Sequence, residues 1–210
     1  MACNKFVSHV TGFSTLFGVE MVQGDISTAA QVFLVPVFFL IGSLLSGFLI
    51  DGRMQRSLEP RYSLVFFFMT LSTATILGLG ASHVFGAFGM TADMENDFLL
   101  LALLCFSCGL QNATVTSAYG AVVRTTHLTG LTTDLGVGLS KMLNRKIDVT
   151  KRRNEVKANL MRVGIIVSFT MGSLICGFIF VKANYWGFVI PFLISLGLLI
   201  FSLAFKEKTM

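Results

Sequence analysis

The chain has 210 residues, of which 54% are hydrophobic and only 13% are charged, and its net charge is +5. A soluble domain carries roughly 25% charged residues, so this composition excludes the ordinary soluble class. Several apolar runs of about 20 residues predict a polytopic membrane protein instead. The positive charge does not predict nucleic-acid binding, because the basic residues gather in particular loops rather than along one face. We also expect no cleavable signal peptide, since residues 1–23 lack a basic start followed by an apolar core.

Five apolar segments are each long enough to cross about 30 Å of hydrocarbon as a helix. They are Gln31–Ile50, Tyr62–Phe85, Phe98–Ser117, Val163–Val181 and Tyr185–Phe205. Helix is the expected backbone, because amide groups in lipid must be satisfied within the segment. In the first segment we expect breaks at Pro36, Gly42 and Gly47. The sequence therefore predicts an all-α polytopic membrane protein with five transmembrane helices, forming a single integral membrane domain over residues 1–210.

The basic residues predict the orientation of these spans. Of the 16 Lys and Arg, three lie in residues 51–61, nine in residues 124–162 and two in the C-terminal tail. Residues 86–97 carry three acids and no base. Because positively charged loops stay in the cytoplasm, the loops 51–61 and 124–158 and the C-terminus are predicted to be cytoplasmic, in a bacterial inner membrane.

Two sequence blocks occur twice and in the same order. Ser8–Gly18 and Thr126–Gly136 share five of eleven positions, and Gly42–Ile50 is echoed by Gly172–Phe180. The shared positions of the first pair are His9/His127, Thr11/Thr129, Gly12/Gly130, Thr15/Thr133 and Gly18/Gly136. Two matches in one order predict an internal duplication, with repeat one over residues 1–90 and repeat two over residues 97–210.

The two copies are predicted to be inverted. With the expected orientation, the first His-x-Thr-Gly block falls outside and the second falls inside, as in many transporter folds. An inverted repeat needs an odd number of spans in each unit. The second unit has three expected spans and the first has two, so we expect a pseudo-inverted three-helix repeat in which the first helix of repeat one is missing.

The chain also resembles a known family. The runs Gly109-Leu-Gln-Asn-Ala113 and Val123-Arg-Thr-Thr-His-Leu-Thr-Gly130 look like the YoaK family of small bacterial integral membrane proteins, and Ser8-His-Val-Thr-Gly12 resembles its first-half counterpart. The likeness covers essentially the whole chain and implies a fold and a location, not a reaction. Members usually carry an additional first helix, and an Asn where this chain has Phe13. The departure suggests a truncated or mis-started reading frame.

The third expected span carries polar residues in its inner half: Gln111, Asn112, Thr114 and Thr116. An unpaired amide in lipid costs several kcal/mol, so these side chains must face protein or a water-filled cavity. One interpretation is a solute or ion site near the membrane midplane. The other is interhelical hydrogen bonding, worth about 0.6–2 kcal/mol per contact.

The His-x-Thr-Gly blocks resemble helix starts. Thr125 or Thr126 would cap a short helix that runs to about Leu143. Its free N–H groups, beside Arg124 and His127, suit an anion or a carboxylate. The alternative is a capped amphipathic helix lying on the membrane surface. The residues expected to bind substrate are Gln111, Asn112, Thr114, His127, Thr129, Gly130, His9 and Thr11.

Small residues recur at helical spacing in the first and fourth spans: Gly42, Ser43 and Gly47, and Gly172, Ser173 and Gly177. We expect them to mediate close helix packing, between the two helices or across a homodimer interface. Gly47-Phe-Leu-Ile-Asp51 with Arg53 also resembles the Gly-x-Leu-x-Asp loop of major-facilitator transporters. The plain alternative is a helix end with snorkelling charges.

The leading functional hypothesis is a transporter, or half of one, for a small solute or ion. The alternative is a non-transporting membrane scaffold whose basic loop, Leu143–Lys157, recruits anionic lipid or a cytosolic partner. We expect no enzyme, because the spans hold no carboxylate pair, nucleophile–base pair or metal triad. Cys105 and Cys108 lie in an apolar span without a basic neighbour, and no His has a second ligand at i+3 or i+4, so we expect no cofactor or metal. The expected partners are membrane lipid and the solute, and no nucleic acid.

Overall fold

The computed structural model describes residues 7–86, 88–89, 94–119, 128–143 and 148–207, and within these ranges all the regular secondary structure is helical. The elements are α1 (Val10–Gln23), α2 (Ile26–Leu49), α3 (Asp51–Met54), α4 (Tyr62–Ala81), α5 (Met94–Tyr119), α6 (Leu128–Leu143), α7 (Val149–Ala183), the 3-10 turn η1 (Asn184–Phe188) and α8 (Val189–Glu207). The predicted all-α class is confirmed.

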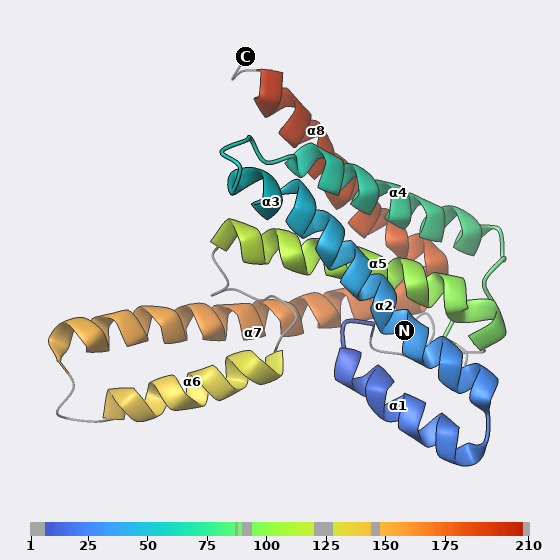
Figure 1. The fold of residues 1–210 in the computed structure, drawn as a ribbon, viewed down its shortest axis with the longest axis horizontal. Coiled ribbons are helices and arrows are strands. Elements are labelled where there is room, and N and C mark those ends of the chain that lie inside the picture. Colours follow the sequence, from blue (N-terminus) through green and yellow to red (C-terminus); the bar gives the residue numbers. More distant parts are fainter. Residues whose placement is uncertain (1–6, 87, 90–93, 120–127, 144–147, 208–210) are drawn as a thin grey trace.

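Four helical segments of the described chain are long and apolar enough to cross a membrane: Ile26–Met54, Tyr62–Ala81, Asp97–Ala118 and Val149–Ala204. The protein is therefore a multi-pass α-helical membrane protein. The expected count of five is not confirmed, because the last two expected spans fall in one continuous helical run of 56 residues. A straight helix of that length would measure about 84 Å, against about 30 Å of hydrocarbon. The run instead changes direction at η1, between α7 and α8 (Figure 1).

The first span is one helix, and the expected breaks inside it are wrong. α2 continues from Ile26 to Leu49 through Pro36, Gly42 and Gly47. Pro36 removes one backbone donor, whereas a real break in lipid would expose several amide groups at once. The helix begins at Asp25, whose carboxylate accepts the Thr28 N–H at 2.9 Å. That hydrogen bond holds the pKa of Asp25 below its usual value.

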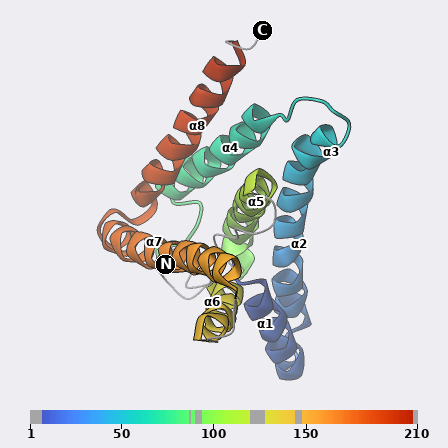
Figure 2. The same cartoon turned by 90° about the vertical axis from the view of Figure 1, so that its left-hand side faces the viewer.

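The helix α5 lies at the centre of the bundle. Figure 2 shows it between α2 and α4, with α8 on the far side of α4. The main apolar core gathers side chains from α1, α2, α4, α5 and η1: Phe13, Val32, Val35, Ile76, Phe85, Leu100, Leu101, Cys105, Tyr185 and Phe188. The side chains of α5 that face α2 and α4 are therefore enclosed by protein.

Aromatic side chains fix the turn between α7 and α8. Tyr185 is buried and its hydroxyl donates to Gly86 O at 3.1 Å, while the Phe88 and Phe180 rings stack at 5.8 Å. Gly80 gives Tyr185 its space, because a Cβ there would lie 2.5 Å from the Tyr185 ring. The neighbouring Trp186 is 63% exposed, so its ring can lie among lipid headgroups at the membrane interface.

The first His-x-Thr-Gly block starts a helix, because α1 begins at Val10, directly after His9. A helix is also found where the second was expected, since α6 covers Leu128–Leu143, and the predicted caps Thr125 and Thr126 lie outside the described residues. Each helix then packs antiparallel against the long helix that follows it, α1 on α2 and α6 on α7 (Figure 1).

Candidate functional site between α2 and α5

The helices α2 and α5 touch backbone to backbone. A Cβ on Gly42 would overlap Phe106 O, and one on Gly109 would overlap Phe39 O. Beside this crossing the Ser43 hydroxyl donates to Gly109 O at 3.2 Å. Small residues permit such an approach where lipid gives no hydrophobic drive between helices. Gly42 and Ser43 thus pack closely as predicted, but their partner is α5 and not the fourth expected span.

A hydroxyl pair continues the contact one turn further. Ser46 Oγ and Thr114 Oγ1 lie 2.9 Å apart, and both residues are buried. Thr114 Oγ1 also donates to Leu110 O at 2.7 Å. Since a hydroxyl has one proton, Thr114 must accept the proton of Ser46. The two hydrogen bonds therefore run in one direction, from Ser46 to Thr114 and from Thr114 to Leu110 O.

A carboxylate ends this line of polar groups. The Ser117 hydroxyl of α5 donates to Asp51 Oδ2 at the start of α3. Asp51 is half-buried. The nearby Arg53 is turned away, because its Nε donates to Glu59 O at 2.7 Å. Within the described ranges the ion pairs involve Glu155 alone, so Asp51 is held by a neutral hydroxyl rather than by a cation.

We call this set the α2–α5 seam: Ser43, Ser46 and Asp51 facing Gly109, Thr114 and Ser117. A surface groove of about 500 Å³ opens beside it. The groove is lined by Leu40, Ser43, Leu44, Gly47, Phe48, Asp51, Gly52, Gln55 and Arg56. It is apolar along α2 and polar at α3, where an acid, an amide and a guanidinium come together. Such a groove suits a small solute with a charged or polar end.

The other side of α5 carries a second polar contact. Ser107 Oγ donates to Ser72 Oγ at 2.8 Å, and Ser72 Oγ donates to Leu103 O at 3.2 Å. Thr73 and Ser195 join α4 to α8 through a hydroxyl contact of 3.3 Å. Hydroxyl groups thus link α2, α5, α4 and α8 through the interior. The sequence reasoning missed them, although small hydroxyl residues inside apolar spans were a visible signal.

The residues predicted for α5 do not form one site. Asn112 and Thr114 are both buried, but two positions turn a helix by about 200°, so they lie on different sides of α5. Gln111 is exposed. Thr116 Oγ1 donates to Asn112 O at 2.8 Å, which satisfies it within its own helix. Of these four, Thr114 alone belongs to the seam.

The residues predicted from the His-x-Thr-Gly blocks lie elsewhere. Thr129 and Gly130 are exposed on α6, and α6 packs on α7 rather than on α5 in the part of the chain that the structure describes. His9 and Thr11 are exposed at the start of α1. Arg124 and His127 lie outside the described residues. These blocks and Asn112 are therefore not brought together.

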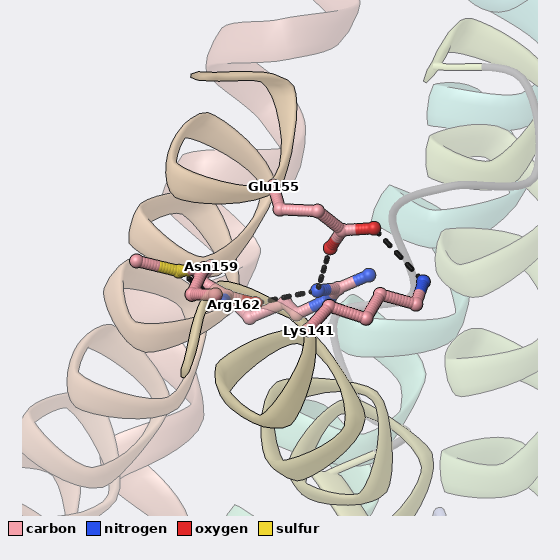
Figure 3. A network of polar contacts seen from close by, with 5 residues as sticks. Lys141, Glu155, Asn159 and Arg162 are labelled. Atoms are coloured by element: carbon pink, nitrogen blue, oxygen red, sulfur yellow. Dashed lines mark hydrogen bonds and ion pairs between the residues drawn. The ribbon is translucent and has the colours of Figure 1, made fainter. Parts of the chain in front are cut away.

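A separate charged cluster joins α6 to α7 (Figure 3). Lys141 Nζ lies 2.9 Å from Glu155 Oε1, and Arg162 Nη1 lies 3.7 Å from Glu155 Oε2. Arg162 Nη1 also donates to Asn159 Oδ1 at 2.6 Å. We call these four residues the α6–α7 clasp. Gly138 lets the two helices meet there, because a Cβ on it would overlap Asn159 Oδ1.

Next to the clasp lie four basic residues that form no ion pair with another described residue. Lys151, Arg152, Arg153 and Lys157 are all exposed on the first turns of α7. The α6–α7 hairpin thus ends in a basic surface.

With this geometry in view, the comparisons with known proteins place the chain. The family model described as "Protein of unknown function (DUF1275)" matches residues 1–201. The chain therefore belongs to this family, an uncharacterised group of YoaK-like membrane proteins, as the resemblance implied. No curated protein and no solved structure matches it.

Proposed function

We propose that this family member is an inner-membrane transporter of a small solute or ion, not an enzyme, and that the α2–α5 seam is its binding site. One observation carries the proposal. Asp51 ends an apolar helix, faces a groove of about 500 Å³ and is held by the neutral Ser117 hydroxyl. Ionisable groups within membrane helices are costly and mark ion or substrate pathways.

The chemistry of Asp51 favours a cation or a proton as one transported species. Although Arg56 lines the same groove, Asp51 forms no ion pair with another described residue, so its carboxylate can accept an incoming cation. A bound cation or proton neutralises the Asp51 carboxylate. Neutralisation lowers the free-energy cost of placing Asp51 in a medium of low dielectric during a transport cycle. The Ser43 hydroxyl, which also lines the groove, supplies a further oxygen ligand.

We further propose that the chain crosses the membrane five times and is an inverted repeat. Several matched details support this. The Thr15 hydroxyl donates to Thr11 O at 3.1 Å, and its counterpart Thr133 donates to Thr129 O at 3.0 Å. Phe13 and Leu131, which occupy equivalent positions, are both buried. In Figure 1, α1 and α6 run in opposite directions, and so do α2 and α7.

The long helices also correspond. α7 begins at an Asp cap as α2 does, because Asp148 Oδ2 accepts the Thr150 N–H at 3.1 Å. Seventeen residues separate Asp25 from Gly42, and 24 separate Asp148 from Gly172. Seven extra residues make about two helical turns and return the glycine to nearly the same face. Those extra turns hold the basic surface of α7.

The arrangement of the helix ends supports the proposed orientation. In Figure 1 the end of α3 and the start of α7 both lie to the left of the end of α4. We infer that the basic residues of the loop 51–61 and of the start of α7 face the cytoplasm, as the positive-inside rule predicts.

Flux through proteoliposomes tests the transport proposal. The full chain is reconstituted with a pH-sensitive dye inside, and proton movement is followed under an imposed potential with Na⁺ or K⁺ gradients and a panel of small amines, acids and sugars. Asp51→Asn should abolish flux and Ser117→Ala should reduce it about tenfold, the loss of one charge-assisted hydrogen bond. Glu59→Gln, a matched neutralisation in the adjoining loop, should leave it unchanged. If the Asp51→Asn variant transports at the wild-type rate, the seam is not the binding site.

The basic surface of α7 favours a second candidate, a scaffold that holds anionic membranes or partners. Each Lys or Arg near an anionic lipid surface contributes about 1 kcal/mol of attraction. Tethering of phosphatidylglycerol vesicles to reconstituted protein tests it. The triple variant Lys151→Gln, Arg152→Gln, Arg153→Gln should lose tethering if this role is real, and equal tethering would exclude it.

A further inference from the structure

The groove beside the α2–α5 seam runs along the last turns of α2 and ends at α3. Its apolar wall consists of Leu40, Leu44 and Phe48, which follow one another at every fourth position and are 56%, 55% and 71% exposed. The adjacent row contains Ser43 and Gly47, and an added Cβ on Gly47 would meet nothing within 4 Å. A row of large side chains beside a row of small ones leaves a furrow along the helix. We call it the α2–α3 groove.

The α2–α3 groove opens toward lipid rather than into the protein interior. All of its lining residues belong to α2, to α3 or to the two positions after α3, so no other described helix closes it. In Figure 2, α3 and the adjoining end of α2 lie at the edge of the bundle. A molecule can therefore enter the groove sideways from the bilayer.

The division of the groove into an apolar and a polar part matches one leaflet of a membrane. Leu40 lies eleven positions before Asp51. That separation is about 17 Å along a helix, and one leaflet contributes about 15 Å of hydrocarbon, half of the roughly 30 Å core. With Leu40 near the midplane, Asp51, Gln55 and Arg56 therefore lie at the level of the lipid headgroups.

The polar end of the groove carries both signs of charge. Asp51 supplies a carboxylate and Arg56 a guanidinium, and neither forms an ion pair with another described residue. Gln55 adds an amide. A headgroup with a phosphate and a primary ammonium is complementary to this set, because a guanidinium binds phosphate and a carboxylate accepts ammonium N–H groups. An anionic lipid would satisfy Arg56 alone and would place its negative charge beside Asp51.

We propose that the α2–α3 groove binds one phospholipid of the cytoplasmic leaflet whose headgroup ends in a primary ammonium, phosphatidylethanolamine. The ammonium contacts Asp51, the phosphate contacts Arg56 and Gln55, and one acyl chain follows the apolar row of α2 past Gly47. The inference rests on the proposed function, because it takes Asp51 as a group that accepts a cation and the α3 end as cytoplasmic. It adds a regulation of that site, since a lipid ammonium on Asp51 competes with a transported cation.

The choline headgroup supplies a close comparison. Phosphatidylcholine carries the same two charges, but its nitrogen has no N–H group and cannot donate a hydrogen bond to Asp51. The groove should therefore select between two lipids of equal net charge. The basic surface of α7 does not affect this comparison, because it attracts the two zwitterions equally.

Native mass spectrometry of the full-length protein tests the proposal. Protein in detergent micelles is titrated with the dioleoyl form of either lipid, and bound lipid is counted per protein. We expect one phosphatidylethanolamine to bind about tenfold more tightly than phosphatidylcholine, the effect of a hydrogen bond to a charged group. Asp51→Asn should lower this preference to about twofold or less, whereas Glu59→Gln in the adjoining loop should retain it. Equal binding of the two lipids by the wild-type protein, or an undiminished preference in Asp51→Asn, would overturn the proposal.

A second pair of variants locates the lipid in the groove. Gly47→Trp fills the groove without meeting a neighbour at its Cβ, and it should weaken phosphatidylethanolamine binding about tenfold. Gly78→Trp is the matched control, since Gly78 is exposed on α4 with nothing within 4 Å, and it should change nothing. Both variants should keep the elution profile of the folded protomer. If folded Gly47→Trp binds the lipid as the wild type does, the lipid lies elsewhere and the proposal is wrong.

Competition identifies the part of the lipid that is recognised. Glycerophosphoethanolamine has the headgroup without acyl chains, and phosphatidylglycerol has the chains with an anionic headgroup. Neither should displace bound phosphatidylethanolamine at equal concentration. Displacement by the first would assign the groove to a small soluble zwitterion and displacement by the second to net charge, and either result would contradict the proposal. Because lipid binding is measured without flux, the absence of transport would leave a selective groove intact, and an unselective groove would leave the flux of Asp51→Asn to decide the transport proposal.

Discussion

The helices α2 and α7 carry the same block of small residues in opposite surroundings. In α2 the block is pressed against α5, so that Gly42 has no room for a Cβ, whereas in α7 Gly172 meets nothing within 4 Å. The small residues therefore allow another helix to approach closely, but they do not determine which helix packs there. In one half of the protein the neighbour is in the same chain. In the other half no described residue fills this position.

The two hairpins differ in a similar way. α1 packs on α2 through apolar groups, with the Phe17 and Phe33 rings 5.4 Å apart and Phe13 buried in the main core. α6 is held to α7 by the clasp around Glu155. The first hairpin is thus part of the core, and the second is attached by charges at the surface.

The largest expected effect contrasts the two glycines. Gly42→Leu forces a side chain into the backbone of α5 and should lower the free energy of unfolding by about 3 kcal/mol or more. Gly172→Leu has open space and should change the stability of the protomer by less than about 0.5 kcal/mol. Thermal unfolding in detergent, followed by a thiol-reactive dye, measures both. Equal destabilisation by the two variants would remove the contrast between the helices.

A smaller effect is expected from the hydroxyl pair in the seam. A double-mutant cycle of Ser46→Ala and Thr114→Ala should give a coupling energy of about 0.6–1.7 kcal/mol, as for hydrogen bonds between membrane helices. Thr133→Ala on the exposed face of α6 serves as the control and should show no coupling to Ser46→Ala. Unfolding in mixed micelles measures the four variants of the cycle. Additive effects within the pair would show that the 2.9 Å contact contributes nothing.

The smallest effect distinguishes the hairpins by their response to salt. Exposed ion pairs contribute about 0–1 kcal/mol and are screened by salt. Raising NaCl from about 0.05 to 0.5 M should therefore speed hydrogen exchange in α6 and in the first turns of α7, and should leave α1 unchanged. Glu155→Gln should remove this salt dependence. Salt-independent exchange in wild-type α6 would mean that the clasp does not hold the hairpin.

The sequence predicted the helices well, because length and apolarity decide them in lipid. The charge deficit predicted the membrane class, and the His-x-Thr-Gly blocks predicted the starts of α1 and α6. The break predicted at Pro36 was wrong, because in lipid the unpaired amide groups of a broken helix are too costly. The sequence predicted two spans, Val163–Val181 and Tyr185–Phe205, where the structure has one helical run that changes direction at η1. The contacts of Tyr185 with Gly80 and Gly86 that hold this turn join residues distant in the sequence.

The site was predicted less well than the fold. Asn112 and Thr114 were grouped because they are adjacent in the sequence, yet the helical rotation separates them. Asp51 and Ser117 lie 66 positions apart, and only the crossing of α2 and α5 brings them together. The hydrogen bonds of Ser46 and Ser107 were not predicted, because hydroxyl residues are common in apolar helices and the partners Thr114 and Ser72 are on other helices.

Accessibility labelling at Thr11 and Thr129 tests the inverted arrangement of the two halves most directly. Each residue is exposed and is replaced singly by Cys in a background without the four native cysteines, and intact cells are treated with a membrane-impermeant maleimide. We expect Thr11→Cys to react from outside, and Thr129→Cys to react only after the membrane is permeabilised. Labelling of both positions from the same side would contradict the inversion.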